Sequence, residues 1–289
     1  MSNEIISVAP GIYYGMSNAD YHASEGISKS GLDLIANSPL HYYARKLDPK
    51  RPPEAEQTIA QQNGEIAHCA ILEPVEFAKR FKVGPDATRS TKQWKEFEAM
   101  LPNGASAIKP DQSIAAWRQA ESVRRIDDIA KSLSVGHAEV SAYWIDEETG
   151  VLCKCRPDFV HDCGDAGVVL VDVKTCGNAS PGEFSRMIAK HRYHVQDAYY
   201  SEGFALASGR RVLGFVFAAV EMSYPYAASA IQLDAESREQ GRADFRRDLN
   251  TYAKCKNSDT WPGYGNEVHI ARLPGWAFDQ EDEMEIGYI

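Results

Sequence analysis

The stretch "VVLVDVKT" (residues 168–175) combines an apolar, strand-like run with two opposite charges. In a strand, alternate side chains point to the same face, so Asp172 and Lys174 should lie on one face of the strand while Val171 and Val173 lie on the other. Asp158, in "RPDFV" (residues 156–160), precedes Asp172 by 14 residues, which is room for one tight hairpin. We therefore expect the two aspartates to converge at one edge of a sheet.

The pattern on either side of this stretch predicts an α+β fold. The N-terminal third shows helical spacing, with Ser28 as a helix cap and Pro39 in the first turn of the next helix. Strands are predicted over 138–145, 151–160 and 168–175 as an antiparallel meander, and again over 211–221 and 226–234. Helical patterns cover 181–209 and 235–255. We expect one domain over 1–289, α/β/α-like, with a helical part to about 135 and a core of mixed sheet and flanking helices over about 136–260.

Composition narrows the functional classes. The formal net charge of −10 argues against a surface that coats nucleic acid indiscriminately, although it leaves room for a local basic channel. No run approaches the roughly 18 apolar residues of a membrane span, and the first residues do not resemble a signal peptide. We expect a cytoplasmic protein with no membrane partner. The six cysteines are then reduced thiols, and the pair Cys153 and Cys155 lacks the second pair of a zinc site.

Two carboxylates brought to one place repel each other unless a cation lies between them. Oxygen ligands of this kind suit Mg²⁺ or Mn²⁺ better than zinc. Lys174 would then stand next to the attacking water, where it would orient the water or stabilise charge on a phosphate. The residues alone leave a second interpretation open, in which Asp172 and Lys174 form an ordinary ion pair at the rim of a sheet.

The surrounding motifs favour the first interpretation. "RPDFV" and "VDVKT" together form P-D…D-x-K, and this pattern resembles the PD-(D/E)XK nuclease superfamily. Glu139 in "EVSAYW", the Q-x-x-x-Y in "VQDAYY" and the G-x-x-x-H in "GEIAHCAILEP" are similar to the RecB-like branch of that superfamily. Residues 21–47 and "TWPGYG" (260–265) resemble the exonuclease VIII (RecE) C-terminal nuclease domain family, so the similarity extends from about residue 11 to about 265.

The resemblance implies a role for each motif residue. Lys174 would assist the attacking water, Glu139 would be a further acidic group, and Gln196 would position the water or a DNA phosphate. Tyr200 would support Gln196 or contact DNA. The divalent metal, Mg²⁺ with Mn²⁺ as the alternative, would be held by His68, Asp158, Asp172 and the backbone carbonyl of Val173. Without the motifs, His68 reads as a packed core histidine, and Gln196 and Tyr200 read as ordinary helix residues.

As a function, the resemblance implies a metal-dependent deoxyribonuclease, expected to be a 5′→3′ exonuclease on double-stranded DNA ends. It would expose a single strand for an annealing protein in phage-type recombination, in a bacterial or phage-encoded setting. Related enzymes thread DNA through a ring of identical subunits, so we expect a homo-oligomeric ring, and a tetramer before a trimer. We expect no iron–sulfur cluster, because Cys255 is the one cysteine in the last hundred residues. The alternatives are an endonuclease with the same core and an inactive DNA-binding module.

Overall fold

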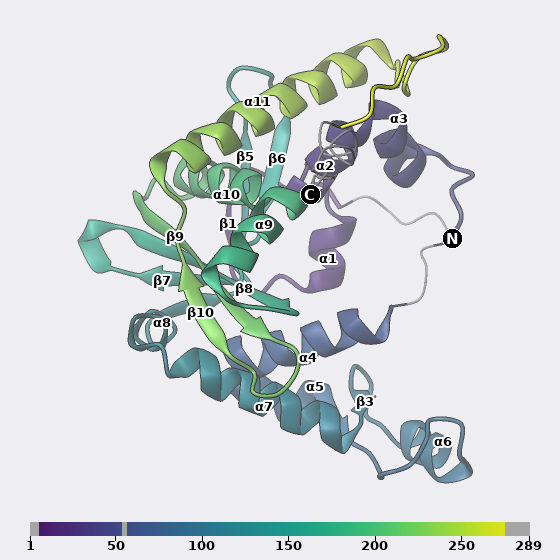
Figure 1. Cartoon of the computed structure of the whole chain (residues 1–289), viewed down its shortest axis with the longest axis vertical. Helices are drawn as coiled ribbons and strands as arrows, with labels where there is room; N and C mark the ends of the chain where they lie inside the picture. The colour runs from purple at the N-terminus through teal and green to yellow at the C-terminus, as the bar shows by residue number, and fades with distance from the viewer. Residues whose placement is uncertain (1–5, 54–56, 275–289) are drawn as a thin grey trace, which may run out of the picture.

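A five-stranded mixed sheet forms the centre of the fold in the computed structural model, which describes residues 6–53 and 57–274 (Figure 1). The strand order is β10-β9-β8-β7-β4. The central pair, β8 and β9, is parallel, and the other neighbours are antiparallel. The bounds are β4 (Gly136–Ala138), β7 (Phe159–Asp162), β8 (Val168–Cys176), β9 (Val212–Glu221) and β10 (Ala228–Ile231).

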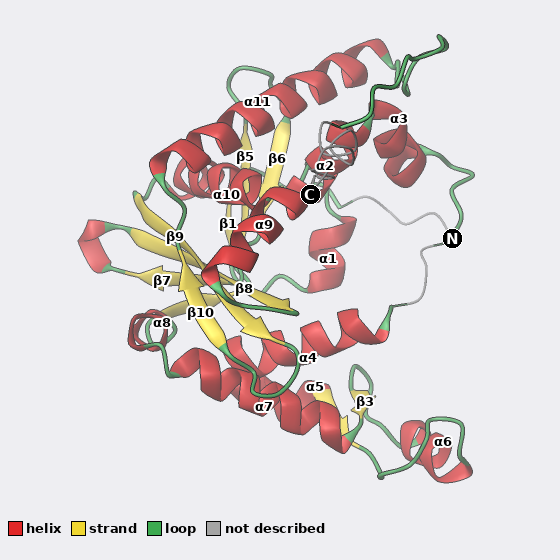
Figure 2. Ribbon diagram, viewed as in Figure 1, coloured by secondary structure: helices red, strands yellow, loops and turns green. Residues whose placement is uncertain are grey.

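Helices cover both faces of this sheet (Figure 2). One face carries α2 (Lys29–Asn37), α9 (Pro181–His191), α10 (Tyr193–Ser208) and α11 (Ala235–Ser258). The other face carries α4 (Ile59–Leu72), α5 (Pro74–Arg80), α7 (Pro110–Arg124) and α8 (Asp127–Ser132). Strand β8 divides its side chains between the two cores, since Leu170 packs with the first group and Val171 and Val173 pack with the second. The expected helix–sheet–helix arrangement is confirmed.

A second, antiparallel sheet has the order β1-β5-β6, from β1 (Gly11–Tyr13), β5 (Ser141–Ile145) and β6 (Leu152–Cys155). It packs against α10, where Gly203 leaves room for the ring of Trp144. Short elements complete the described chain: α1 (Asn18–Ala23), α3 (Pro39–Tyr42), the π-helix η1 (Tyr43–Leu47), β2 (Phe81–Val83), α6 (Lys92–Ala99), β3 (Ser106–Ile108) and the 3₁₀ turn η2 (Gly164–Ala166). Within 6–53 and 57–274, no helix is both long enough and apolar enough to cross a membrane.

The predicted meander has the expected antiparallel pairing of consecutive segments, but its first two segments are divided between two sheets. The segment 138–145 divides into β4 and β5, and 151–160 divides into β6 and β7, so each of these two segments contributes to both sheets. Two backbone features cause the division. Glu139 adopts a left-handed conformation with φ of 54°, and Pro157 has no N–H to continue a ladder. The hairpin from β7 to β8 is present as predicted.

The predicted helix ends in the N-terminal third are confirmed. The Ser28 hydroxyl accepts a hydrogen bond from the Gly31 N–H, and Pro39 begins α3. The predicted helix over 181–209 is instead two helices, because Arg192 turns the backbone with a left-handed φ of 55°. Arg192 holds this turn by ion pairs to Asp33 of α2 and Asp248 of α11.

Candidate active site

Asp172 lies near the C-terminal end of β8, on the face that α10 covers. Its side chain is only 2% exposed, and its two oxygens have different partners. Gln196 of α10 donates from Nε2 to Oδ2, while the Lys174 ammonium contacts Oδ1 in an ion pair. Both oxygens of the carboxylate thus have a partner. The alternation expected from the sequence places Asp172 beside Lys174, and α10 brings Gln196 to the same group.

Asp158 lies beside this group, in the link between β6 and β7. Its Oδ2 accepts a hydrogen bond from the Val173 N–H at 2.7 Å and lies 3.5 Å from Nδ1 of His68. His68 comes from α4, which passes close to β8 at Gly64, where an added Cβ would be 3.4 Å from Oγ1 of Thr175. A side chain as small as alanine would therefore also fit at this position, four residues before the histidine.

Glu139 interacts with Asp158 through a backbone hydrogen bond and through the charge of its side chain. Its N–H donates to the Asp158 carbonyl at 2.9 Å. Burial, and then the negative charge of Asp158, raise the pKa of Glu139 to about 8. Burial, and then Asp158 again, raise the pKa of Asp172 to about 6, although Lys174 opposes this shift. The ionised forms of Glu139 and Asp172 are therefore disfavoured by their surroundings.

Lys174 is sheltered by the ring of Tyr193, the first residue of α10. Its ammonium lies 4.8 Å from the ring centroid, in cation–π contact. Burial opposes the charge on Lys174, but Asp172 and Asp158 outweigh burial and raise the pKa of this lysine. Tyr193 lies outside the motifs of the sequence. Its spacing offers a signal, because it precedes Gln196 by three residues and so shares that face of the helix.

Tyr200 lies one turn beyond Gln196 and packs mainly as a scaffold residue. Its ring meets Phe215 of β9 edge-on, with centroids 6.2 Å apart. Burial raises the pKa of its hydroxyl well above the usual value, and the charges of Asp172 and Asp158 add to that effect. Tyr200 thus lies near the aspartates and packs α10 against the sheet, and its implied role of supporting Gln196 or contacting DNA stays a prediction.

The predicted metal ligands are close together but do not form a ready-made cage. Within the described ranges, no three His, Cys, Asp or Glu side chains are arranged to hold one ion. Asp158 turns towards His68, while Asp172 turns towards Lys174 and Gln196. The donors nevertheless fit a hard divalent cation, because two carboxylates and an imidazole lie close together and the two aspartates repel each other. The ligand assignment, including the Val173 carbonyl, remains a prediction.

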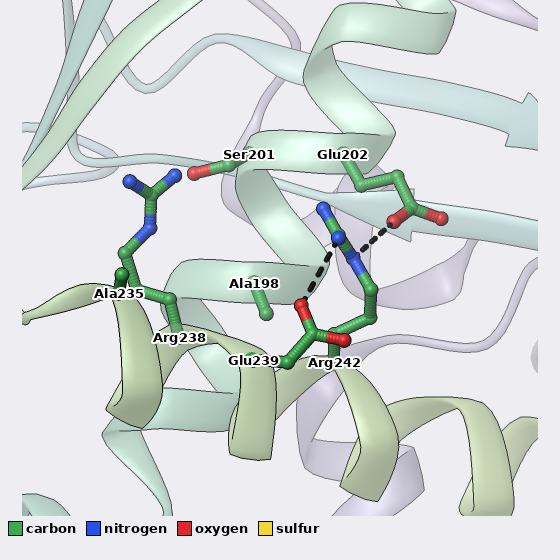
Figure 3. Close-up of a pocket in the computed structure, with 7 residues that line it drawn as sticks. All are labelled: Ala198, Ser201, Glu202, Ala235, Arg238, Glu239 and Arg242. Carbon is green, nitrogen blue, oxygen red and sulfur yellow. Dashed lines mark hydrogen bonds and ion pairs between the residues drawn. The ribbon is translucent and has the colours of Figure 1, made fainter.

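Two surface hollows lie apart from this group. One lies between α10 and α11 and is lined by Ala198, Ser201, Glu202, Ala235, Arg238, Glu239 and Arg242. Figure 3 shows that Arg242 within it pairs with Glu202 and Glu239. The other is formed by turns around Asp162 and Arg210, which pair with each other. Neither hollow includes a residue that the motifs identified, so the candidate site is the strand end and not a closed pocket.

Comparisons with known proteins agree with this architecture. A family model described as "PDDEXK-like domain of unknown function (DUF3799)" matches residues 28–274. A solved structure from Eubacterium rectale, described as "Putative exonuclease", superposes with a TM-score of 0.61 at 14% identity, covering 93% of this chain and 99% of its own. A second structure, SSO0001, has a TM-score of 0.27 at 14% identity, covering 48% of this chain and 60% of its own, which is too low to indicate a shared fold. No curated protein sequence matches.

The match to the family model covers most of the chain and includes every motif residue named above. The likeness to the E. rectale structure independently shows the fold, because it extends over nearly the full length of both chains. The P-D…D-x-K residues lie at the end of β8 and in the link before β7, on a mixed sheet between helices. The chain therefore belongs to the PDDEXK-like family DUF3799, and its core is that of the PD-(D/E)XK nucleases.

Proposed function

We propose that this protein is a divalent-metal-dependent deoxyribonuclease. The observation that carries the proposal is the buried Asp172, held by Lys174 and Gln196 next to Asp158. A simple ion pair at a sheet rim would be exposed, whereas the Asp172 side chain is 2% exposed and the Lys174 side chain 18%. Burying two carboxylates side by side costs free energy that a structural role does not recover. A cation and a phosphate substrate would recover it.

The residues divide the work of phosphodiester hydrolysis. A divalent cation held by His68, Asp158 and Asp172 would supply positive charge to the phosphate in the transition state and to the leaving oxygen. The Lys174 ammonium, freed from Asp172, donates hydrogen bonds to the attacking water or to a phosphate oxygen. Gln196 keeps the Asp172 carboxylate in one orientation. As water adds to phosphorus it releases a proton to solvent, the bond from phosphorus to the leaving sugar oxygen breaks, and that oxygen takes up a proton from solvent.

We further propose that the substrate is linear duplex DNA degraded from its 5′ ends. The support is the resemblance of the motifs to the exonuclease VIII family, together with the likeness in fold to a protein described as an exonuclease. Degradation of one strand would leave a single strand for an annealing partner. The two alternative functions are an endonuclease and an inactive DNA-binding module, and the assay distinguishes both from an exonuclease.

The test uses duplex DNA labelled at either the 5′ or the 3′ ends, with Mg²⁺ and with a chelator. We expect release of 5′ label as mononucleotides, loss of all cleavage in chelator, and no cleavage of covalently closed circles. Lys174→Ala should lose nearly all cleavage while remaining folded at the assay temperature, because it removes help to the transition state; its melting temperature should fall, since the buried Asp172 loses a partner. Cutting of closed circles would identify an endonuclease. Wild-type protein that binds DNA but never cuts it would identify a binding module.

A further inference from the structure

Lys29 is a sheltered lysine that no motif identified. It is the first residue of α2, and its side chain is 11% exposed. Its ammonium donates to the carbonyl of His191, at the end of α9, at 2.8 Å, and pairs with Asp33 at 2.8 Å. This lysine thus reaches from the N-terminal helices to the turn where α10 begins.

Lys29 and the proposed catalytic lysine share one aromatic ring. The Lys29 ammonium lies 5.8 Å from the centroid of the Tyr193 ring, and the Lys174 ammonium lies 4.8 Å from it. Burial lowers the pKa of Lys29, and the positive charges of Lys174 and Arg192 act in the same direction, against Asp33. Two ammonium groups are therefore held at one side of the site, although each disfavours the charge of the other.

Asp33, the acidic partner of Lys29, interacts with two cations. Asp33 also accepts a hydrogen bond from Arg192, with Nη1 at 2.9 Å. Arg192 holds the turn between α9 and α10 through its ion pair with Asp33. Lys29 adds a second positive charge to the same carboxylate. A structural link between these helices does not require that second cation. Tyr193 is half-buried, and both ammonium groups contact its ring.

We propose that Lys29 binds a backbone phosphate of the strand being cleaved, beside the phosphate that Lys174 contacts. A lysine ammonium is a point charge that binds phosphate without needing a planar fork, and phosphate contacts position DNA without reading its sequence. Tyr193 holds the two ammonium groups in register. This inference rests on the proposed function, since it assumes a DNA strand in the site.

The test measures binding of a short fluorescein-labelled duplex by anisotropy in chelator, where no cleavage occurs. Lys29→Met should weaken binding several-fold and make the slope of log K against log salt shallower by about 1, because one phosphate contact is lost. Lys29→Arg should restore both. Lys190→Met, which removes an exposed charge from the neighbouring α9, is the matched control and should bind as the wild type does.

Asp33→Asn separates a substrate contact from a structural link. If Lys29 serves only to bind α2 through Asp33, both Asp33→Asn and Lys29→Met should lower the melting temperature and weaken binding together. If Lys29 holds phosphate, the salt slope should become shallower in Lys29→Met but stay that of the wild type in Asp33→Asn, because Asp33→Asn removes no phosphate contact even where it loosens the turn held by Arg192. The same salt slope in the two variants, or an unchanged salt slope in Lys29→Met, would overturn the inference alone. A wild-type protein that does not bind the duplex would overturn the proposed function with it.

Discussion

Burial of the Asp172 carboxylate destabilises the fold, and the same carboxylate is central to the proposed chemistry. This carboxylate is buried beside Asp158, and both effects raise its pKa to about 6. Lys174 and Gln196 offset part of that cost. A group that is destabilised in this way gains most from a cation, because the ion removes the repulsion and replaces lost water. Stability should therefore respond to metal before any DNA is present.

We expect Mg²⁺ and Mn²⁺ to raise the melting temperature of the wild-type protein. At a metal concentration 100-fold above the dissociation constant, the free energy of unfolding should increase by about 2.7 kcal/mol. Asp158→Asn should abolish the increase while still accepting the hydrogen bond from the Val173 N–H. Asp165→Asn, in the exposed turn η2, is the control and should respond as the wild type does. An equal response in all three proteins would place the metal elsewhere.

At the scale of the elements, the position of α10 depends on two close contacts. Gly203 accommodates Trp144 of β5, and Gly241 of α11 approaches the backbone of α10. A Cβ at Gly241 would lie 2.1 Å from the carbonyl oxygen of His194, which cannot move without shifting α10. The depth of the helix that carries Tyr193 and Gln196 is therefore set by Gly203 on α10 itself and by Gly241 on α11.

Gly241→Ala should destabilise the protein, although helix propensity alone predicts a gain of up to about 1 kcal/mol. The added methyl group is blocked by backbone, and overpacking of this kind costs about 1–3 kcal/mol. Gly182→Ala, in the first turn of α9, is the matched control, because an added Cβ there meets nothing within 4 Å. Urea denaturation curves measure both. A gain in stability for Gly241→Ala would contradict the close crossing of α10 and α11.

At the scale of the whole molecule, a chain with a net charge of −10 has to bind DNA, which is itself a polyanion. Many of its arginines pair within the fold, as Arg246 does with Asp146 and Glu202. A single copy therefore presents few cations to DNA. Cyclic symmetry would multiply a small basic patch such as Lys29 and Lys174 around one axis, while acidic outer faces keep the assembly in solution.

We accordingly propose a homo-oligomeric ring, and a tetramer before a trimer, with the sites of all subunits facing a central channel. Light scattering over a series of protein concentrations should report a closed oligomer with a mass that does not grow further. Its degradation of long duplexes should be processive, because DNA threaded through a ring leaves slowly. A particle that remains at the monomer mass while it degrades DNA processively would refute the ring.

Local pattern decided several features of this protein before any tertiary contact is considered. The two-residue period of a strand places Asp172 and Lys174 on one face, and the helical period places His68 one turn after Gly64. Ser28 and Pro39 mark helix ends by their own hydrogen-bonding chemistry. These inferences hold because they depend on residues within one or two turns of each other.

Only the tertiary structure decided how the strands divide between two sheets and which cations are buried. Lys154 and Arg156 alternate with apolar residues and look solvent-facing in sequence, yet both are buried against Tyr21 of α1. The Lys154 ammonium donates to the carbonyls of Tyr21 and Ser24, partners more than a hundred residues away. Lys29 reaches Tyr193 over a similar separation. Periodicity specifies a face but not the partner that covers it, and the partner is chosen by the packing of the whole chain.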